Sequence, residues 1–339
     1  MTFVKLLTAT HRPLTLASMV NLTHAELGRV VCLHFGRELE AQRGSKVRMK
    51  GLGAIYGAVA EGAAWRAAIE GAEEGGGGEL RALALSTREE IRHELSVMTG
   101  TLLRSLPLDR QWVRAVDNIF ASGTHASMVL QLLGDGAAPV EAAQCRVALG
   151  EVIESATSGI ALLSREKFSV VPPLVVEFDD DDDASANARR AWALPGTLEF
   201  IVAELLKNAV GSTIARYGAL DVDDAPPIRV TVARDGGDGD GDGEDRIALT
   251  ISDSGEGIPR EGFERLGSAF HTTFVRDEAL NEGGGASSGV PFSGSGFGTF
   301  RSAVFADFID ARLSIASDGE GRGATSTLLL RPWSAKTKS

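Results

Sequence analysis

The chain has 339 residues, a formal net charge of −12 at pH 7, 43% hydrophobic residues and 24% charged residues. This composition excludes a wholly disordered chain and supplies enough apolar residues for the cores of two domains. No apolar run reaches the ~18 residues of a membrane-spanning helix, and the negative charge disfavours contact with phosphate backbones. We therefore expect neither an integral membrane protein nor a nucleic-acid-binding protein.

The N-terminal segment lacks acidic residues. The first acidic residue is Glu26, and Lys5 and Arg12 precede it among several Thr and Ser residues. A start of this kind is compatible with a transit peptide. Residues 1–13 are accordingly expected to be either a transit segment or an ordinary flexible terminus.

Residues 14–140 show helical periodicity and little strand-like alternation, which predicts a helical bundle. Ser86 or Thr87, followed three residues later by Glu89 or Glu90, has the pattern of a capping box. A helix is therefore expected to begin at this point.

The hydrophobic pattern of the sequence changes after residue 149. Helical periodicity and strand-like alternation now occur in separate runs, which predicts an α+β domain over 149–335 with a mostly antiparallel sheet. Helices are expected over 151–168, 197–217 and 301–309, and strands over 228–232, 247–251, 312–317 and 325–331.

The helix expected at 197–217 has one apolar stripe and one unusual polar face. At 100° per residue, Glu204, Lys207, Asn208 and Gly211 lie on an arc that is separate from the apolar stripe. An Asn oxygen can bind Mg²⁺, a Lys can meet a phosphate and a Glu can accept a proton. This combination suits a site for a metal and a phosphate, although a solvated helix face is the simpler reading of the helix alone.

Two glycine-rich segments strengthen the first reading. Asp253-Ser254-Gly255-Glu256-Gly257 follows an expected strand directly, so that a carboxylate and exposed backbone lie together at the strand end. Gly294-Ser295-Gly296-Phe297-Gly298 precedes an expected helix, whose first N–H groups favour anions.

These three segments resemble the N, G1 and G2 boxes of the GHKL superfamily, which includes gyrase, a class of heat-shock chaperones, histidine kinases and mismatch-repair ATPases. The run Glu204-Leu205-Leu206-Lys207-Asn208-Ala209, with Ile251-Ser252-Asp253, Phe270-His271-Thr272-Thr273 and Gly296-Phe297-Gly298, is most similar to the mitochondrial 2-oxo-acid dehydrogenase kinases. The resemblance implies a helical regulatory or docking domain at 14–140. An α/β-sandwich (Bergerat-type) ATP-binding kinase domain with a mixed, mostly antiparallel sheet would follow at 149–335.

The resemblance also implies roles for single residues. Glu204 would be the general base, Asn208 would hold Mg²⁺, and Asp253 would accept a hydrogen bond from the exocyclic amine of adenine. The remaining contacts to ATP would come from Lys207, Gly255, Gly257, Thr272, Thr273, Gly294, Ser295, Gly296, Phe297, Gly298, Thr299 and Thr325. A potassium ion would be held by backbone oxygens at Leu266, Ser268 and His271.

By the same resemblance the chain would be a protein serine kinase in the mitochondrial matrix. Its substrate would be the E1α subunit of a 2-oxo-acid dehydrogenase complex, with the branched-chain complex slightly preferred over the pyruvate complex. The lipoyl-bearing E2 core would be a second partner, and the kinase would form a homodimer.

Alternative functions remain open at two positions. His93 resembles a family histidine that orients the catalytic Glu, but His93-Glu94-Leu95 also resembles the start of a histidine-kinase phosphoacceptor box, and a solvated histidine is the bland reading. The last family box, Gly-x-Gly-Thr, is Gly321-Arg322-Gly323-Ala324-Thr325 here, with the Thr displaced by one residue. That displacement leaves an ATP-binding pseudokinase or interaction module as a further alternative.

Overall fold

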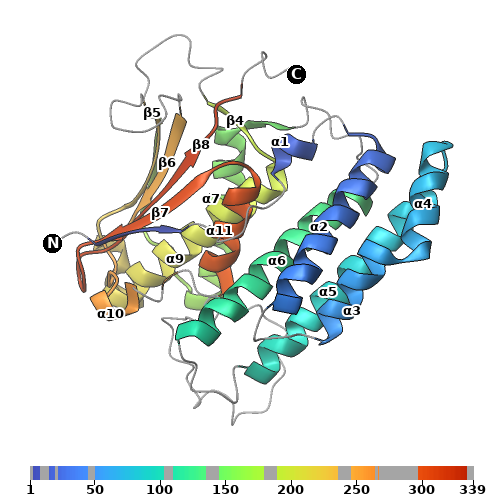
Figure 1. Cartoon of the computed structure of the whole chain (residues 1–339). Helices are drawn as coiled ribbons and strands as arrows, with labels where there is room; N and C mark the ends of the chain where they lie inside the picture. The colour runs from blue at the N-terminus through green and yellow to red at the C-terminus, as the bar shows by residue number, and fades with distance from the viewer. Residues whose placement is uncertain are drawn as a thin grey trace. The chain divides into compact units, whose positions relative to one another are not determined.

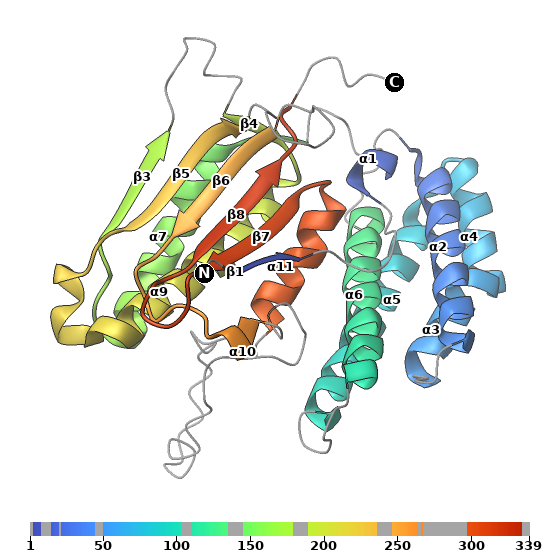
Figure 2. The same ribbon diagram turned by 60° about the vertical axis from the view of Figure 1, so that its left-hand side comes forward.

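The computed structural model describes residues 3–7, 15–19, 22–44, 50–102, 110–134, 145–178, 189–235, 246–263, 266 and 297–333. The chain forms two compact units (Figures 1 and 2). One consists of Ala9–Cys145, and the other combines Met1–Thr8 with Arg146–Ser339. The chain therefore starts in the second unit, passes through the first and then returns.

The first unit is helical. Its helices are α1 (Leu16–Met19), α2 (His24–Gly44), α3 (Lys50–Glu61), α4 (Ala63–Glu73), α5 (Gly78–Leu102) and α6 (Arg110–Gly134). Helix α2 packs against α3, α4 and α6, and α5 packs against α6. The expected helical bundle is confirmed.

Aromatic and aliphatic side chains fill the interior of this helical unit. Phe35 on α2 and Tyr56 on α3 are fully buried, and their rings pack edge to face with centroids 5.0 Å apart. The Tyr56 hydroxyl lies 3.2 Å from the Ser122 hydroxyl on α6, which satisfies a polar group that would otherwise be buried alone.

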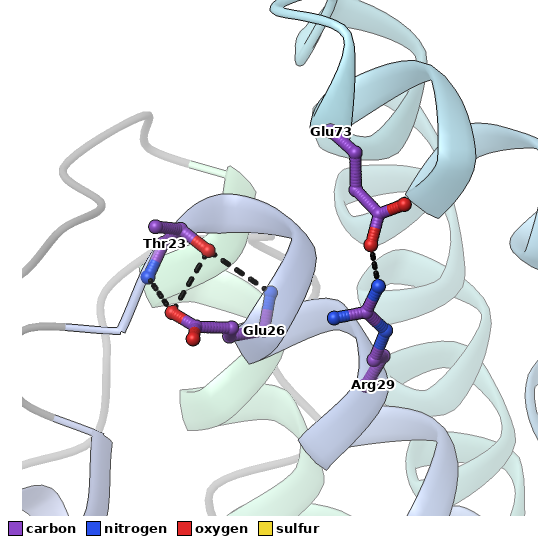
Figure 3. Close-up of polar contacts among 4 residues, drawn as sticks. All are labelled: Thr23, Glu26, Arg29 and Glu73. Atoms are coloured by element: carbon purple, nitrogen blue, oxygen red, sulfur yellow. Dashed lines mark hydrogen bonds and ion pairs between the residues drawn. The ribbon is translucent and has the colours of Figure 1, made fainter.

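The capping box of this unit stands at the start of α2 and not at Ser86. The backbone N–H of Thr23 donates to Glu26 Oε2 at 2.8 Å, and the N–H of Glu26 donates to Thr23 Oγ1 at 3.3 Å (Figure 3). The prediction of a helix start at Ser86 or Thr87 is wrong, because α5 already begins at Gly78. The Ser86 hydroxyl bonds the Glu90 side chain and not a free N–H group.

The second unit contains a six-stranded sheet among the residues that the structure describes, in the order β1-β7-β8-β6-β5-β3. All neighbouring strands are antiparallel except β3 and β5, which are parallel. The strands are β1 (Phe3–Leu7), β3 (Leu174–Phe178), β5 (Ile228–Asp235), β6 (Arg246–Ser252), β7 (Arg312–Ser317) and β8 (Thr325–Leu330). Strands β2 (Arg146–Ala148) and β4 (Arg190–Trp192) pair separately.

One face of the large sheet is covered by helices (Figure 2). These are α7 (Leu149–Phe168), α9 (Pro195–Asp221) and α11 (Phe297–Phe308). Of the short elements, η2 (Val222–Asp224) comes directly after α9, and α10 (Arg260–Phe263) comes after β6. Alternate residues of β6 are buried, as expected for a sheet with one covered face. The predicted α+β class, with a mixed and mostly antiparallel sheet, is confirmed.

Helix α9 is the central helix of this unit. Pro195 stands in its first turn, where no intrahelical N–H is needed. The predicted apolar stripe is buried throughout and consists of Leu198, Ile201, Val202, Leu205 and Ala209. The helix is interrupted at Gly218, which has φ 74°, so its regular part ends at Tyr217 as predicted.

Two further elements differ from the sequence expectations. Within residues 1–13, Phe3–Leu7 form β1, which pairs along its whole length with β7. Helix α11 starts at Phe297, earlier than predicted, so Phe297, Gly298 and Thr299 lie in a helical turn and not in a loop. None of the helices in the described part of the chain is long and apolar enough to cross a membrane.

Candidate active site

The polar face of α9 carries an ion pair. Lys207 Nζ donates to Glu204 Oε1 at 2.5 Å, and the two side chains are only 13% and 17% exposed. Asn208, one residue further, is exposed to solvent. A carboxylate, an ammonium group and a carboxamide therefore share one helix face, as the periodicity predicted.

The first turn of α11 lies against this face. Asn208 Nδ2 donates to Thr299 Oγ1 at 3.3 Å, and a Cβ atom at Gly298 would collide with Glu204 Oε2. Because only glycine fits there, the backbone of α11 can approach the carboxylate directly. Among the described residues nothing donates a hydrogen bond to the Asn208 carbonyl oxygen, which leaves it able to hold a metal ion.

Asp253 occupies the end of β6. Its Oδ1 accepts hydrogen bonds from the backbone N–H groups of Gly255 at 2.8 Å and Ala324 at 3.3 Å. Burial raises the pKa of Asp253 to about 6, although these two N–H groups act in the opposite direction. Within the described residues Oδ2 accepts no hydrogen bond, so one carboxylate oxygen is kept for a ligand.

Two glycine turns interlock around Asp253. Gly257 and Gly323 have φ values of 72° and 68°, and a Cβ atom at Gly323 would collide with the Asp253 carbonyl oxygen. The N–H of Gly323 donates to the Gly255 carbonyl at 3.2 Å. Buried Ser317 donates to the Gly323 carbonyl at 2.7 Å and so fixes the second turn.

Helix α9 also holds the Asp253 turn through residues that the sequence reading missed. Arg216 Nη1 donates to the Ser254 carbonyl at 2.6 Å, and Ser212 Oγ accepts the N–H of Glu256 at 3.0 Å. A Cβ atom at Gly255 would collide with Ser212. Ser212 and Arg216 stand four and eight residues after Asn208, so the periodicity of the polar face was a signal that could have found them.

Thr325 lies at the start of β8, opposite Ser252 on β6. Its hydroxyl is 3.1 Å from the Ser252 hydroxyl. The displaced threonine of the last box is thus two residues from Gly323, beside the strand that leads to Asp253.

The remaining predicted site residues do not lie on the elements of the site described above. Thr272, Thr273, Gly294, Ser295, Gly296, Ser268 and His271 lie outside the described residues. Leu266 is buried. His93 stands on α5 of the helical unit and is exposed.

The second unit thus joins an anion-favouring helix start, an amide oxygen that can hold a metal ion, and the half-buried carboxylate of Asp253, one oxygen of which accepts no hydrogen bond from the described residues. Residues 194–333 match a family model described as histidine kinase-, DNA gyrase B-, and HSP90-like ATPase. This segment is an ATPase domain of that family. The ATPase domain includes every site residue of α9, β6, α11 and β8 named above, and its family implies ATP as a ligand.

Two curated relatives of the chain are mitochondrial kinases. The [pyruvate dehydrogenase (acetyl-transferring)] kinase of Drosophila melanogaster is 24% identical over 183 residues, or 54% of this chain and 41% of the relative. The kinase of the same name from Ascaris suum is 29% identical over 142 residues, or 41% of this chain and 31% of the relative. The chain thus matches less than half the length of each relative. These relatives support the resemblance to the 2-oxo-acid dehydrogenase kinases.

Proposed function

We propose that the chain is an ATP-dependent protein kinase that phosphorylates a serine of the E1α subunit of a 2-oxo-acid dehydrogenase complex. The arrangement of Glu204, Lys207 and Asn208 on α9, against the start of α11, is the observation that carries the proposal. Similarity to pyruvate dehydrogenase kinases supports this choice of substrate class.

ATP would bind with its adenine at Asp253 and its phosphates at the start of α11. Asp253 Oδ2 can accept from the exocyclic amine of adenine. The ring would lie beside the turn at Gly255 and Gly257, whose missing side chains let this turn pack closely against Ser212 and Gly319. Lys207 and Thr299 would contact the phosphates, as would the predicted residues outside the described part. Mg²⁺ held by Asn208 would offset phosphate charge when bound.

Glu204 would act as the general base. In the proposed step Glu204 takes the proton from the substrate serine hydroxyl, and the serine oxygen forms a bond to the γ-phosphorus. The bond from that phosphorus to the β,γ-bridging oxygen breaks, and ADP leaves with the electron pair. Lys207 pairs with Glu204 in the structure and would be released from it by the phosphates.

Labelled ATP and purified E1 from the pyruvate and branched-chain complexes test the proposal. We expect acid-stable label on an E1α serine, with the branched-chain E1 slightly preferred.

Asn208→Ala should abolish binding or turnover of Mg-ATP, because the metal loses its amide ligand. Unchanged affinity and activity in Asn208→Ala would show that the metal assignment is wrong.

Two alternative functions predict different products. A histidine kinase would give acid-labile, base-stable label on its own His93, which is exposed on α5. A pseudokinase would show a nucleotide-dependent melting shift without transfer of label to either E1.

If His93 instead orients Glu204, His93→Gln should lower turnover while nucleotide affinity is retained.

Further parts of the proposal rest on the relatives and the resemblance. We propose that the kinase works in the mitochondrial matrix as a homodimer and binds the lipoyl-bearing E2 core. Potassium would be held by the backbone at Leu266, Ser268 and His271. Loss of activity when K⁺ is replaced by Na⁺ would support that ion.

A further inference from the structure

Two side chains of α9 hold the turn that follows β6. Arg216 Nη1 donates to the Ser254 carbonyl at 2.6 Å and to the Gly255 carbonyl at 3.3 Å. Ser212 Oγ accepts the backbone N–H of Glu256 at 3.0 Å. Hydrogen bonds from a charged donor are stronger than those between neutral groups. Three consecutive residues of this turn are therefore tied to one helix.

The backbone of Gly255 joins Arg216 to Asp253. Its carbonyl accepts from Arg216 and, at 3.2 Å, from the N–H of Gly323 in the turn between β7 and β8. Its N–H donates to Asp253 Oδ1 at 2.8 Å. Because both groups belong to one residue, a displacement of the carbonyl also displaces the N–H that orients the carboxylate.

The same turn is enclosed from both sides. A Cβ atom at Gly255 would collide with Ser212 on α9, and a Cβ atom at Gly257 would collide with the carbonyl of Gly319. The turn thus lies in close contact with the helix on one side and with the glycine turn on the other. Loss of either support would give it room to move.

Helix α9 connects this turn to the other end of the proposed nucleotide site. Asn208, Ser212 and Arg216 follow one another at intervals of four residues, so they share one face of the helix. Asn208 contacts Thr299 at the start of α11, whereas Arg216 contacts the turn of Asp253. At 1.5 Å per residue these two contacts are about 12 Å apart along the helix. The helix therefore sets the separation between the phosphate end and the adenine end.

We propose that Arg216 is a positioning residue that, together with Ser212, fixes the Asp253 turn against α9 and so determines affinity and base selectivity for the nucleotide. This inference rests on the adenine site proposed above. Without Arg216, two carbonyls would lose a charged donor, and the Gly255 N–H would no longer hold Asp253 in one orientation. Adenine would then have to order the turn as it binds, which lowers its affinity.

Calorimetric titration of the full chain with Mg-ADP measures this effect. We expect Arg216→Met, which keeps the aliphatic stem, to raise Kd by about 10-fold, the size expected for one hydrogen bond from a charged donor. Arg216→Lys keeps a charged donor and should restore part of the affinity. Arg165→Met is the matched control, because it removes the same charge from an exposed position on α7. It should leave Kd unchanged.

A double-mutant cycle separates positioning from general packing. If Arg216 acts through Asp253, Arg216→Met should weaken binding much less in the Asp253→Asn background than in the unaltered protein. The preference for Mg-ADP over Mg-GDP should also fall in Arg216→Met, because a carboxylate without a fixed orientation discriminates less between the two bases.

Equal losses of affinity in both backgrounds would overturn the inference, as would a lower melting temperature of Arg216→Met with an unchanged Kd. An unchanged Kd in Asp253→Asn alone would refute the adenine site and, with it, the role of Arg216. These measurements use no E1, so their outcome is separate from that of the labelling test.

Discussion

Asp253 is the residue whose surroundings are most clearly built for a ligand. It is largely buried, and both of its backbone hydrogen bonds converge on Oδ1. Its pKa of about 6 lies above the ordinary value of 3.8 because burial disfavours the charge. The free protein therefore carries, at neutral pH, a carboxylate that costs folding stability and that a bound adenine would satisfy.

Asp253→Asn should raise the melting temperature of the free protein at pH 7 to 8, by an effect on the order of 1–3 kcal/mol. A carboxyl group with a raised folded-state pKa loses stability as the pH rises from about 4 to about 6. The gain should therefore disappear near pH 4, where Asp253 is protonated. Affinity for ATP should fall, because an amide donor would replace the free acceptor. Exposed Asp223→Asn is the control and should change neither quantity.

At this scale the sequence predicted the groups to which we assign the reaction, but not the residues that hold the turn around Asp253. Glu204, Asn208 and Asp253 stand in recognisable boxes, so their spacing sufficed. Arg216 lies on the periodic polar face of α9, but its hydrogen bond to the backbone carbonyl of Ser254 leaves no local pattern.

The element that begins most clearly at a capping motif is α2. Thr23 and Glu26 bond each other reciprocally, and Arg29, one turn later, forms an ion pair with Glu73 on α4 (Figure 3). Ser86 and Thr87 have the same pattern as Thr23 in the sequence but lie inside α5. A capping pattern thus marks a helix start only where the preceding residues cannot continue the helix.

Thr23→Ala should destabilise the helical unit by about 1 kcal/mol, because a capping hydroxyl is lost. Thr23→Ser keeps the hydroxyl and should remain close to the unaltered protein. The backbone N–H and then the hydroxyl of Thr23 lower the pKa of Glu26. The contribution of Glu26 is therefore present above its unfolded pKa and is lost as the pH falls through its folded pKa. Thermal melts from pH 3 to 7 measure both effects, and equal melts of the Ala and Ser variants would contradict the role of the cap.

The glycine turns beside Asp253 offer a matched pair of substitutions. Gly321 and Gly323 have nearly the same φ, 67° and 68°, but a Cβ atom at Gly321 meets open space. Gly321→Ala should cost only the backbone strain of about 1–2 kcal/mol. Gly323→Ala should cost more and also weaken ATP binding, because it pushes on the Asp253 backbone. Calorimetry and nucleotide titration compare the two, and equal losses would argue against the interlocked turns.

Among the elements, long periodic segments were predicted well and short ones poorly. The helix at 197–217 has many repeats of one pattern and agrees with α9. The strand at 247–251 is short but alternates cleanly, and it agrees with β6. Strand β1 has only five residues, and its partner β7 lies about three hundred positions away. No local pattern could have indicated that pairing.

On the scale of the whole molecule, two compact units imply two folding transitions. A non-hydrolysable ATP analogue with Mg²⁺ should raise only the transition of the unit that contains Arg146–Ser339. The expected gain is about 2.7 kcal/mol at one hundred times the dissociation constant. Thr23→Ala should lower the transition of the helical unit and Gly323→Ala that of the other unit, so the two variants show which transition belongs to which unit.

A guanine analogue should give no shift, because its O6 is an acceptor that faces the Asp253 acceptor. A shift of the transition that Thr23→Ala lowers would contradict the assignment.

The pairing of Phe3–Leu7 with Arg312–Ser317 also determines when the sheet can be completed. On the ribosome, the first strand emerges long before its neighbour exists, and at 5–20 residues per second the wait is roughly 15–60 s. The intervening helices can fold during that interval, while the opening segment stays unpaired and accessible to chaperones or proteases. A bulky fusion placed directly before Phe3 would therefore hinder the pairing of β1 with β7, which is the last step in completing the sheet of the nucleotide-binding unit.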